Sequence, residues 1–134
     1  MIDIDLDAPE HCVFCRMDRE RIIAASAHSF AIRDGFPVSL GHTLVIPKRH
    51  VRSVFALMDV EINDCMQLLA SVRERLKGPD FSYRDFNVGI NDGEFAGQTV
   101  SHAHIHLIPR RGGDVPNPRG GVRGVIPSKK DYTP

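Results

Sequence analysis

Three histidines at alternate positions constrain this chain more than any other feature of its sequence. Within segment 101–109, His102, His104 and His106 alternate with apolar residues. In a β-strand, side chains two positions apart share a face and are separated by about 6.6 Å. The segment therefore predicts a strand with a row of imidazoles on one face and a core-facing side on the other. Because every buried ring nitrogen needs a partner, such a row indicates a binding or catalytic site.

The rest of the pattern predicts an α+β domain in which one long helix packs across an antiparallel sheet of about five strands. Apolar residues recur at helical spacing from Asp59, the expected N-cap, to Lys77, and Gly78-Pro79 is a typical stop signal. The last two expected strands should pair antiparallel, because a glycine-containing loop joins them. The segments expected to form strands are 21–26, 29–34, 43–46, 85–91 and 101–109.

Length and charge limit the kinds of protein that this chain can be. Its 134 residues predict one domain over 12–134, with a flexible N-terminal arm over 1–11 and an irregular tail from residue 110. Acidic and basic residues balance at 17 each, so no overall field would gather a nucleic acid. No apolar run approaches the roughly 20 residues that span a bilayer, and the acidic start does not resemble a signal peptide. We therefore expect a cytoplasmic protein with neither nucleic-acid nor membrane partners, whose three cysteines are reduced thiols.

Several blocks of the chain resemble one known family, and they occur in the family's order. Segment 102–108 reads His-apolar-His-apolar-His-apolar-apolar, and Gly97-Gln98-Thr99 stands just upstream. This arrangement, together with segments 30–34 and 41–50, resembles the histidine triad (HIT) family, which places a phosphate-binding loop at that upstream position. The tail over 114–127 is similar to that of bacterial members described as diadenosine-polyphosphate-hydrolase-like. A His-x-His-x-His string alone would be weak evidence, whereas the ordered blocks together are specific.

The resemblance implies a hydrolase that acts at the α-phosphate of an adenine-type nucleotide, either a dinucleoside polyphosphate or a nucleoside phosphoramidate. His104 would be the nucleophile that forms a covalent nucleotidyl intermediate, which water then hydrolyses. His106 would donate a hydrogen bond to the same phosphate, and His42 would support the triad from a neighbouring strand. A neutral imidazole suits this role when a carbonyl holds the N–H on its other nitrogen.

The same resemblance implies a set of nucleotide-binding residues. Asp34 would accept hydrogen bonds from the ribose hydroxyls, although an aspartate before Gly35 also fits a simple turn. Ile32 would stack on the base. Asn91 would contact ribose or phosphate, unless it only shapes the Asn-Asp-Gly turn. The full expected set is Ile32, Asp34, Asn91, Gly97, Gln98, Thr99, His104 and His106, in which glycine lets the backbone approach the phosphate closely.

The pair Cys12-x-x-Cys15 has the spacing of zinc ligands. Members of the family that this chain resembles often complete the site with two histidines, which correspond here to His50 and His102. A redox role for the cysteine pair is less favoured, because it requires a thioredoxin-like pattern that the chain lacks. We therefore expect a structural zinc ion and no organic cofactor.

Two other kinds of function remain open on the sequence. His102, His104 and His106 would instead hold a catalytic zinc ion in a metalloenzyme, although imidazoles on one flat strand do not easily converge on one ion. A nucleotide-binding adaptor without turnover would keep every motif. The resemblance also implies a homodimer, formed through an unpaired sheet edge or the apolar stripe of the helix.

Overall fold

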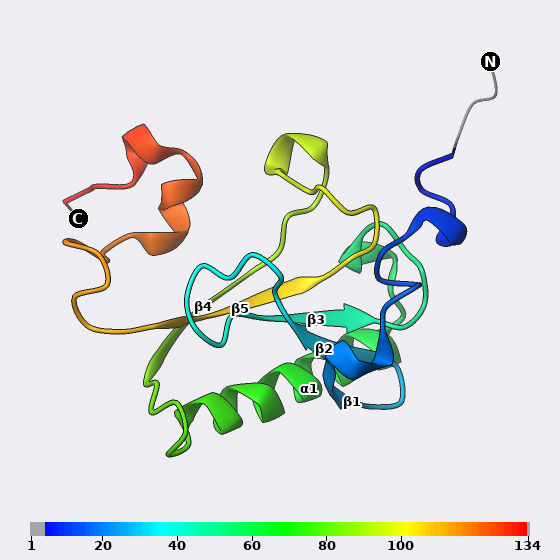
Figure 1. The fold of residues 1–134 in the computed structure, drawn as a ribbon. Coiled ribbons are helices and arrows are strands. Elements are labelled where there is room, and N and C mark those ends of the chain that lie inside the picture. The colour runs from blue at the N-terminus through cyan, green and yellow to red at the C-terminus, as the bar shows by residue number, and fades with distance from the viewer. Residues whose placement is uncertain (1–4, 134) are drawn as a thin grey trace.

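The computed structural model describes residues 5–133 and places a five-stranded sheet against one α-helix, α1 (Asp59–Lys77) (Figure 1). All neighbouring strands are antiparallel, in the order β1-β2-β3-β5-β4. The predicted α+β fold is therefore confirmed. The strands are β1 (Ile22–Ala25), β2 (Ser29–Arg33), β3 (Thr43–Pro47), β4 (Asp85–Gly89) and β5 (Ile105–Arg110). Short 3-10 turns are η1 (Pro9–His11), η2 (Arg19–Arg21), η3 (Val54–Ala56), η4 (Glu94–Ala96), η5 (Gly121–Val125) and η6 (Pro127–Lys129).

Helix α1 has the predicted bounds but not the predicted N-cap. Met58 occupies the N-cap position, and Asp59 is the first helical residue. The reason is Glu61, whose carboxylate accepts a hydrogen bond from the Met58 backbone N–H at 2.9 Å. This contact satisfies one of the free N–H groups at the start of the helix, so a polar N-cap side chain is not needed. Among residues 5–133, no helix is long and apolar enough to cross a membrane.

Strand β5 begins later than the alternating pattern predicts. It pairs with β3 in a register that sets Val45 opposite Ile105, so a continued ladder would bring Pro47 opposite Ala103. Pro47 has no backbone N–H to offer, and Ala103 instead donates its N–H to the Val51 carbonyl at 2.7 Å. Segment 102–104 therefore precedes the strand, although its side chains still alternate between the two faces.

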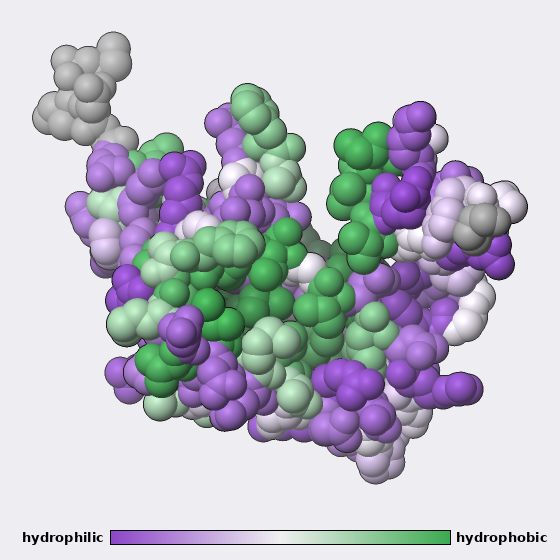
Figure 2. Space-filling model, turned by 180° about the vertical axis from the view of Figure 1, so that it is seen from behind, coloured by the Kyte–Doolittle hydropathy of each residue, from purple (hydrophilic) through white to green (hydrophobic). Residues whose placement is uncertain are grey.

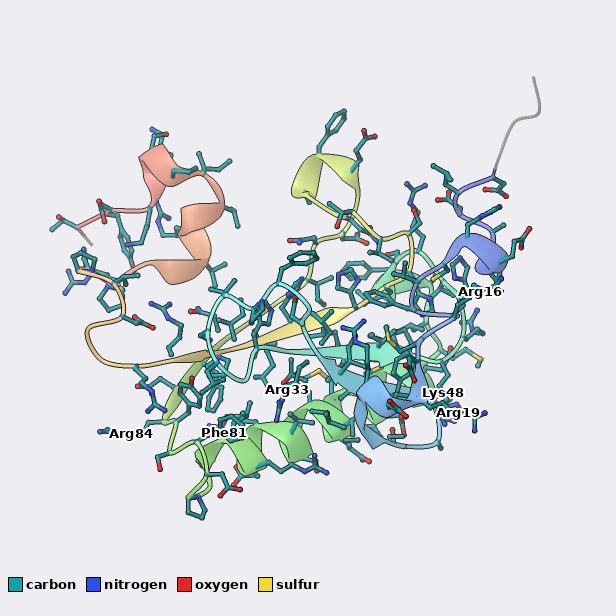
Figure 3. All side chains as sticks on the ribbon, viewed as in Figure 1. Arg16, Arg19, Arg33, Lys48, Phe81 and Arg84 are labelled. Atoms are coloured by element: carbon teal, nitrogen blue, oxygen red, sulfur yellow. The ribbon has the colours of Figure 1, made fainter. Side chains whose placement is uncertain are left out.

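The two faces of the sheet bury two separate apolar clusters. The cluster beneath the sheet joins α1 to side chains such as Val45, Ile105 and Leu107. Arg33 extends from β2 into this layer, where it hydrogen-bonds Thr43 and lies over the ring of Phe81 at 5.3 Å (Figure 3). The cluster on the opposite face consists of Cys12, Phe14, Phe30, Ile32, Leu44 and Ile46. That second face also carries the histidines.

Both ends of the described chain lie against the domain. Of the predicted flexible arm, residues 1–4 lie outside the described residues, whereas Asp7 accepts a hydrogen bond from His50 Nε2 at 2.6 Å through its carbonyl oxygen. The irregular tail lies beside the ends of β4 and β5 (Figure 1). Arg110 connects it to the sheet by donating to both Asn87 and Asp114.

The ion pair between Glu61 and Arg49 provides a test of how α1 is attached to the chain that follows β3. Glu61 is 2% exposed and accepts from Arg49 at 2.8 and 3.0 Å. We expect Glu61→Gln to lower the thermal midpoint by several degrees near neutral pH, because a buried charge-assisted contact is lost. The hydrogen bonds from Arg49 and the Met58 backbone hold the pKa of Glu61 at about 2, below its ordinary value of 4.5.

Since the folded-state pKa is lowered, this stabilisation is complete above pH 4.5 and is lost as the pH falls through about 2. The difference between wild type and Glu61→Gln should therefore shrink in thermal melts at low pH. Glu74→Gln is the control, because the Glu74 side chain is 64% exposed and forms only surface ion pairs. It should change the thermal midpoint little. Equal midpoints for wild type and Glu61→Gln at neutral pH would contradict this account.

Candidate active site and metal centre

The three alternating histidines lie on the sheet face opposite α1. His102 is 0% exposed, His104 is 7% exposed, and the side chain of His106 is 21% exposed. The rings of His104 and His106 are 5.2 Å apart, so the predicted row is present. Phe14 packs edge-to-face against His104 at 5.1 Å and against His102 at 5.8 Å. The sequence predicts no role for Phe14, and the only signal for one is its place between Cys12 and Cys15.

The hydrogen bond of His104 determines which of its nitrogens is available. Its Nδ1 lies 2.8 Å from the backbone carbonyl oxygen of His102. Because a carbonyl can only accept, Nδ1 carries the proton, and a neutral ring then has its lone pair on Nε2. The Nε2 lone pair of His104 is therefore free, which is what a nucleophilic role requires.

In His106 the proton is on the other ring nitrogen, Nε2. Hydrogen bonds from the Val38 N–H to His42, and from His42 to His106, determine this position. The Val38 backbone N–H donates to His42 Nδ1 at 3.0 Å, so the proton of a neutral His42 is on Nε2. That Nε2–H faces His106 Nδ1 at 2.9 Å, which makes Nδ1 the acceptor and leaves the His106 proton on Nε2. His106 Nε2 is buried without a hydrogen-bond partner among the described residues. An unpartnered buried donor beside a nucleophile indicates a place for a ligand oxygen.

Burial keeps these imidazoles neutral. It is the main cause that lowers the pKa of His42, His102 and His106 below the ordinary value for histidine. The neighbouring His104 and His42 lower the pKa of His106 further, while the Asp34 carboxylate opposes the shift. The proton positions assigned above to His42 and His106, which require neutral rings, are therefore those expected near neutral pH.

Asp34 follows β2. One of its carboxylate oxygens makes a turn contact, and the other lies beside two histidines. Its Oδ1 accepts from the Phe36 backbone N–H at 2.8 Å, as in a simple turn. Its Oδ2 lies 3.4 Å from His42 Nε2 and 4.0 Å from His106 Nδ1. The carboxylate is thus part of the histidine cluster, and its side chain is 15% exposed, so it can still be reached from solvent.

The loop before the triad is held by Gln98. Its Oε1 accepts from the Gly93 N–H at 2.9 Å, and its amide nitrogen donates to the carbonyls of Arg52 and Val100 at 2.8 and 3.0 Å. Both amide hydrogens are therefore used inside the protein, where they hold the loop in this conformation. Gly97 has a φ of 92°, a left-handed conformation that favours glycine at the turn.

The other expected nucleotide-binding residues are arranged less uniformly. Thr99 is exposed, and Asn91 is half-buried two residues beyond the end of β4. Ile32 is 1% exposed inside the second apolar cluster, so it presents no free surface to a base in this structure. Ile32 lies on the histidine face of the sheet, because it is paired with Leu44, which in turn is paired with His106. What covers Ile32 comes from distant segments, and strand alternation does not reveal it.

Cys12, Cys15, His50 and His102 form a compact donor cluster. The two histidine Nδ1 atoms are 3.2 Å apart, and the sulfur to Nδ1 distances are 3.2, 3.4 and 3.5 Å. A tetrahedral zinc ion with ordinary bond lengths sets nitrogen atoms about 3.3 Å apart and nitrogen and sulfur about 3.5 Å apart. The spacing of the four donors therefore fits such an ion.

The ring nitrogens of this cluster point their lone pairs inward. His102 donates from Nε2 to the Pro47 carbonyl at 2.7 Å, and His50 donates from Nε2 to the Asp7 carbonyl. Both Nδ1 atoms therefore carry lone pairs and face each other, an arrangement that a cation resolves. Carbonyl partners leave no signal in a sequence, so Asp7 and Pro47 could not be identified from it.

Asp34, His42 and His106 form a second group of closely spaced donor atoms. Hydrogen bonding accounts for it without a metal, because the Val38 N–H occupies His42 Nδ1 and the His42 Nε2–H is directed at His106. A nitrogen that carries a proton has no lone pair for a metal.

The fold and the site define a small α+β protein built around a row of neutral histidines, one with a free lone pair and the next with a free N–H. The HIT domain family matches residues 17–113, which is most of the chain. The chain belongs to this family, as its sequence motifs predict.

Relatives and solved structures agree with this assignment. The adenosine 5′-monophosphoramidase hnt1 of Schizosaccharomyces pombe is 37% identical over 103 residues, 74% of each chain. The bis(5′-nucleosyl)-tetraphosphatase of the same yeast is 41% identical over 78 residues, 58% of this chain and 42% of its own. A HIT family protein from Bacillus anthracis superposes with a TM-score of 0.71 at 36% identity, over 78% of this chain and 76% of its own. A zinc-bound histidine triad family protein from Mycobacterium smegmatis gives a TM-score of 0.67 at 29% identity, over 90% and 94%.

Proposed function

We propose that this protein hydrolyses nucleotides at the α-phosphate through a covalent intermediate on His104. The observation that carries the proposal is the opposite proton assignment of two neighbouring rings, a lone pair on His104 Nε2 and a buried, unpartnered N–H on His106 Nε2. One ring can attack phosphorus while the other donates to the oxygen on which charge develops. The name of one relative, an adenosine 5′-monophosphoramidase, supports an adenine-type nucleotide as substrate, and that of another, a bis(5′-nucleosyl)-tetraphosphatase, supports a dinucleoside polyphosphate.

The reaction would proceed in two displacements. In the first, His104 Nε2 forms a bond to phosphorus and the bond from phosphorus to the leaving group breaks, so a phosphate departs as an anion, and an amine departs after it takes a proton from solvent water. The His104 Nδ1–H remains on the His102 carbonyl and helps to carry the positive charge of the substituted ring. In the second, water attacks phosphorus, the bond to Nε2 breaks, and one proton of the water is released.

The donors around the phosphate would come from three parts of the chain. His106 supplies its free Nε2–H, and the exposed Thr99 hydroxyl lies at the end of the loop that Gln98 holds. Asp34 would accept from the ribose hydroxyls with its partly exposed carboxylate. Asn91 and the backbone after Gly97 would complete the contacts, while Ile32 would meet the base only after the side chains that cover it move.

The deciding variant is His104→Ala or His104→Asn. Either should remove nearly all release of AMP from adenosine phosphoramidate and from diadenosine polyphosphates, because the bond-forming nitrogen is gone. Binding of AMP, measured by calorimetry, should stay within about tenfold, since the other contacts remain. Appreciable turnover by these variants would rule out the covalent mechanism, and an inactive wild type that still binds AMP would favour an adaptor.

We also propose that Cys12, Cys15, His50 and His102 hold a structural zinc ion. The donor spacing and the inward-facing Nδ1 atoms support it, as does the zinc-bound state of the Mycobacterium smegmatis structure. Four protein ligands would close the coordination sphere, so the ion would stabilise the fold and take no part in the chemistry.

Cys15→Ser should therefore lose stoichiometric zinc in metal analysis and lower the thermal midpoint, with kcat reduced far less than by His104→Ala. Cys65→Ala is the matched control, because Cys65 is buried on α1 outside the cluster and its loss should leave the zinc content unchanged. His104→Ala should also keep its zinc. A metal-free wild type of normal stability, or loss of zinc from His104→Ala, would contradict this assignment.

A third proposal concerns assembly into a homodimer through the β4 edge. Strand β4 ends the sheet, so its outer backbone groups have no strand partner there. Exposed apolar side chains on β4, just beyond it and on α1 include Val88 at 45%, Ile90 at 43% and Met66 at 50%. Figure 2 shows that apolar residues, in green, gather on one face of the molecule. A second copy would pair with this edge and cover the adjoining groove, which Val54, Phe55, Leu57, Ile62, Cys65, Met66, Ile90 and Ile105 line.

Val88→Lys should therefore convert a dimer into a monomer, because it introduces a charge into the apolar edge. Sedimentation at micromolar concentration measures the outcome. Leu40→Lys, at a loop position that is 75% exposed, is the control and should leave the mass unchanged. A wild type that sediments as a monomer would refute the dimer.

A further inference from the structure

Asp34 lies where it can act on the histidines as well as on a ribose. We propose that Asp34 is a positioning residue for the chemical step, and that through His42 it keeps the proton of His106 on Nε2. This inference rests on the proposed function, but it concerns what the carboxylate does even when no ribose touches it.

The geometry of the carboxylate carries the first step of the argument. A turn needs only Oδ1, which accepts from the Phe36 N–H at 2.8 Å. The other oxygen, Oδ2, is directed at two imidazoles, 3.4 Å from His42 Nε2 and 4.0 Å from His106 Nδ1. A carboxylate only accepts, so its presence there favours a proton on His42 Nε2.

The second step concerns the orientation of the His42 ring. It is held from both ends, since the Val38 N–H donates to Nδ1 and the Asp34 carboxylate attracts the Nε2–H. His42 is 3% exposed, so water does not compete for either nitrogen. The ring therefore presents its N–H to His106 Nδ1 at 2.9 Å in one orientation only.

The third step joins this chain to the reacting atoms. Because His106 Nδ1 accepts, its proton must be on Nε2, the buried donor without a partner. A donor that is already oriented stabilises developing charge without reorganisation. The carboxylate of Asp34 would thus contribute to the chemical step through two histidines, as outer partners of a site commonly do.

Asp34→Asn isolates this role. The asparagine Oδ1 can still accept from the Phe36 N–H, so the turn is retained, but an NH₂ group replaces Oδ2 and faces the His42 Nε2–H. Two donors then oppose each other, and the ring of His42 loses its fixed orientation. Asp18→Asn is the matched control, because Asp18 Oδ1 accepts from the Glu20 N–H at 3.0 Å in a similar turn that bonds no histidine.

Nitrogen-15 NMR of the ligand-free protein measures the proton position directly. In the wild type and in Asp18→Asn, His106 should have an unprotonated Nδ1 and a protonated Nε2. Asp34→Asn should give a mixture of both tautomers. A single unchanged His106 tautomer in Asp34→Asn would overturn the proposal.

Kinetics with adenosine phosphoramidate and its 2′,3′-dideoxy analogue provide the second test. The analogue has no ribose hydroxyl to bind, so any remaining effect of Asp34→Asn must act through the histidines. We expect Asp34→Asn to lower kcat on the analogue by roughly tenfold or more. An unchanged kcat on the analogue, with only KM altered on the parent substrate, would show that Asp34 binds ribose and does nothing else. If the wild type hydrolyses neither compound, the proposed function fails, while the NMR measurement still decides the present inference.

Discussion

The structure depends on one buried residue, His102, whose two ring nitrogens and carbonyl oxygen contact three different parts of the protein. Its Nε2–H bonds the Pro47 carbonyl at the end of β3, and its Nδ1 points into the cysteine and histidine cluster. Its own carbonyl oxygen accepts the His104 Nδ1–H. One fully buried side chain and its backbone therefore connect the N-terminal segment, the sheet and the His104 ring. A shift of this residue would alter the metal donors and the proton of His104 together.

Hydrogen bonds of this kind explain why the site tolerates so many buried imidazoles. A buried ring nitrogen without a partner is costly, and here nearly every nitrogen meets a carbonyl, an N–H or another ring nitrogen. His104 Nε2 keeps a free lone pair, and among the described residues His106 Nε2 is the ring nitrogen that is fully buried without a partner, at the position where the proposed phosphate would bind. The folded protein thus bears a local cost at the position where a ligand oxygen would relieve it.

The stability of the fold and the geometry of the site are also connected through α1. Glu61 at the start of the helix binds Arg49, the residue directly before His50. Helix α1 beneath the sheet therefore holds the segment that carries His50, while Cys12 belongs to the apolar cluster on the opposite face. His50 and Cys12 are thus held from opposite faces of the sheet. This arrangement accounts for the close spacing of the donor side chains.

The sequence by itself determined the architecture and the family to which the chain belongs. Periodicity gave the bounds of α1 because a nineteen-residue amphipathic segment has no competing structure, and strand alternation placed three histidines on one face. The tertiary structure alone decided which nitrogens carry protons, that Gln98 holds its loop, that Ile32 is covered, and where β5 begins. The physical reason is that a hydrogen bond such as that between His42 and His106 joins residues 64 positions apart, and its direction depends on a third group, the Val38 N–H. Local spacing encodes which side chains share a face, but not which distant backbone groups will meet them.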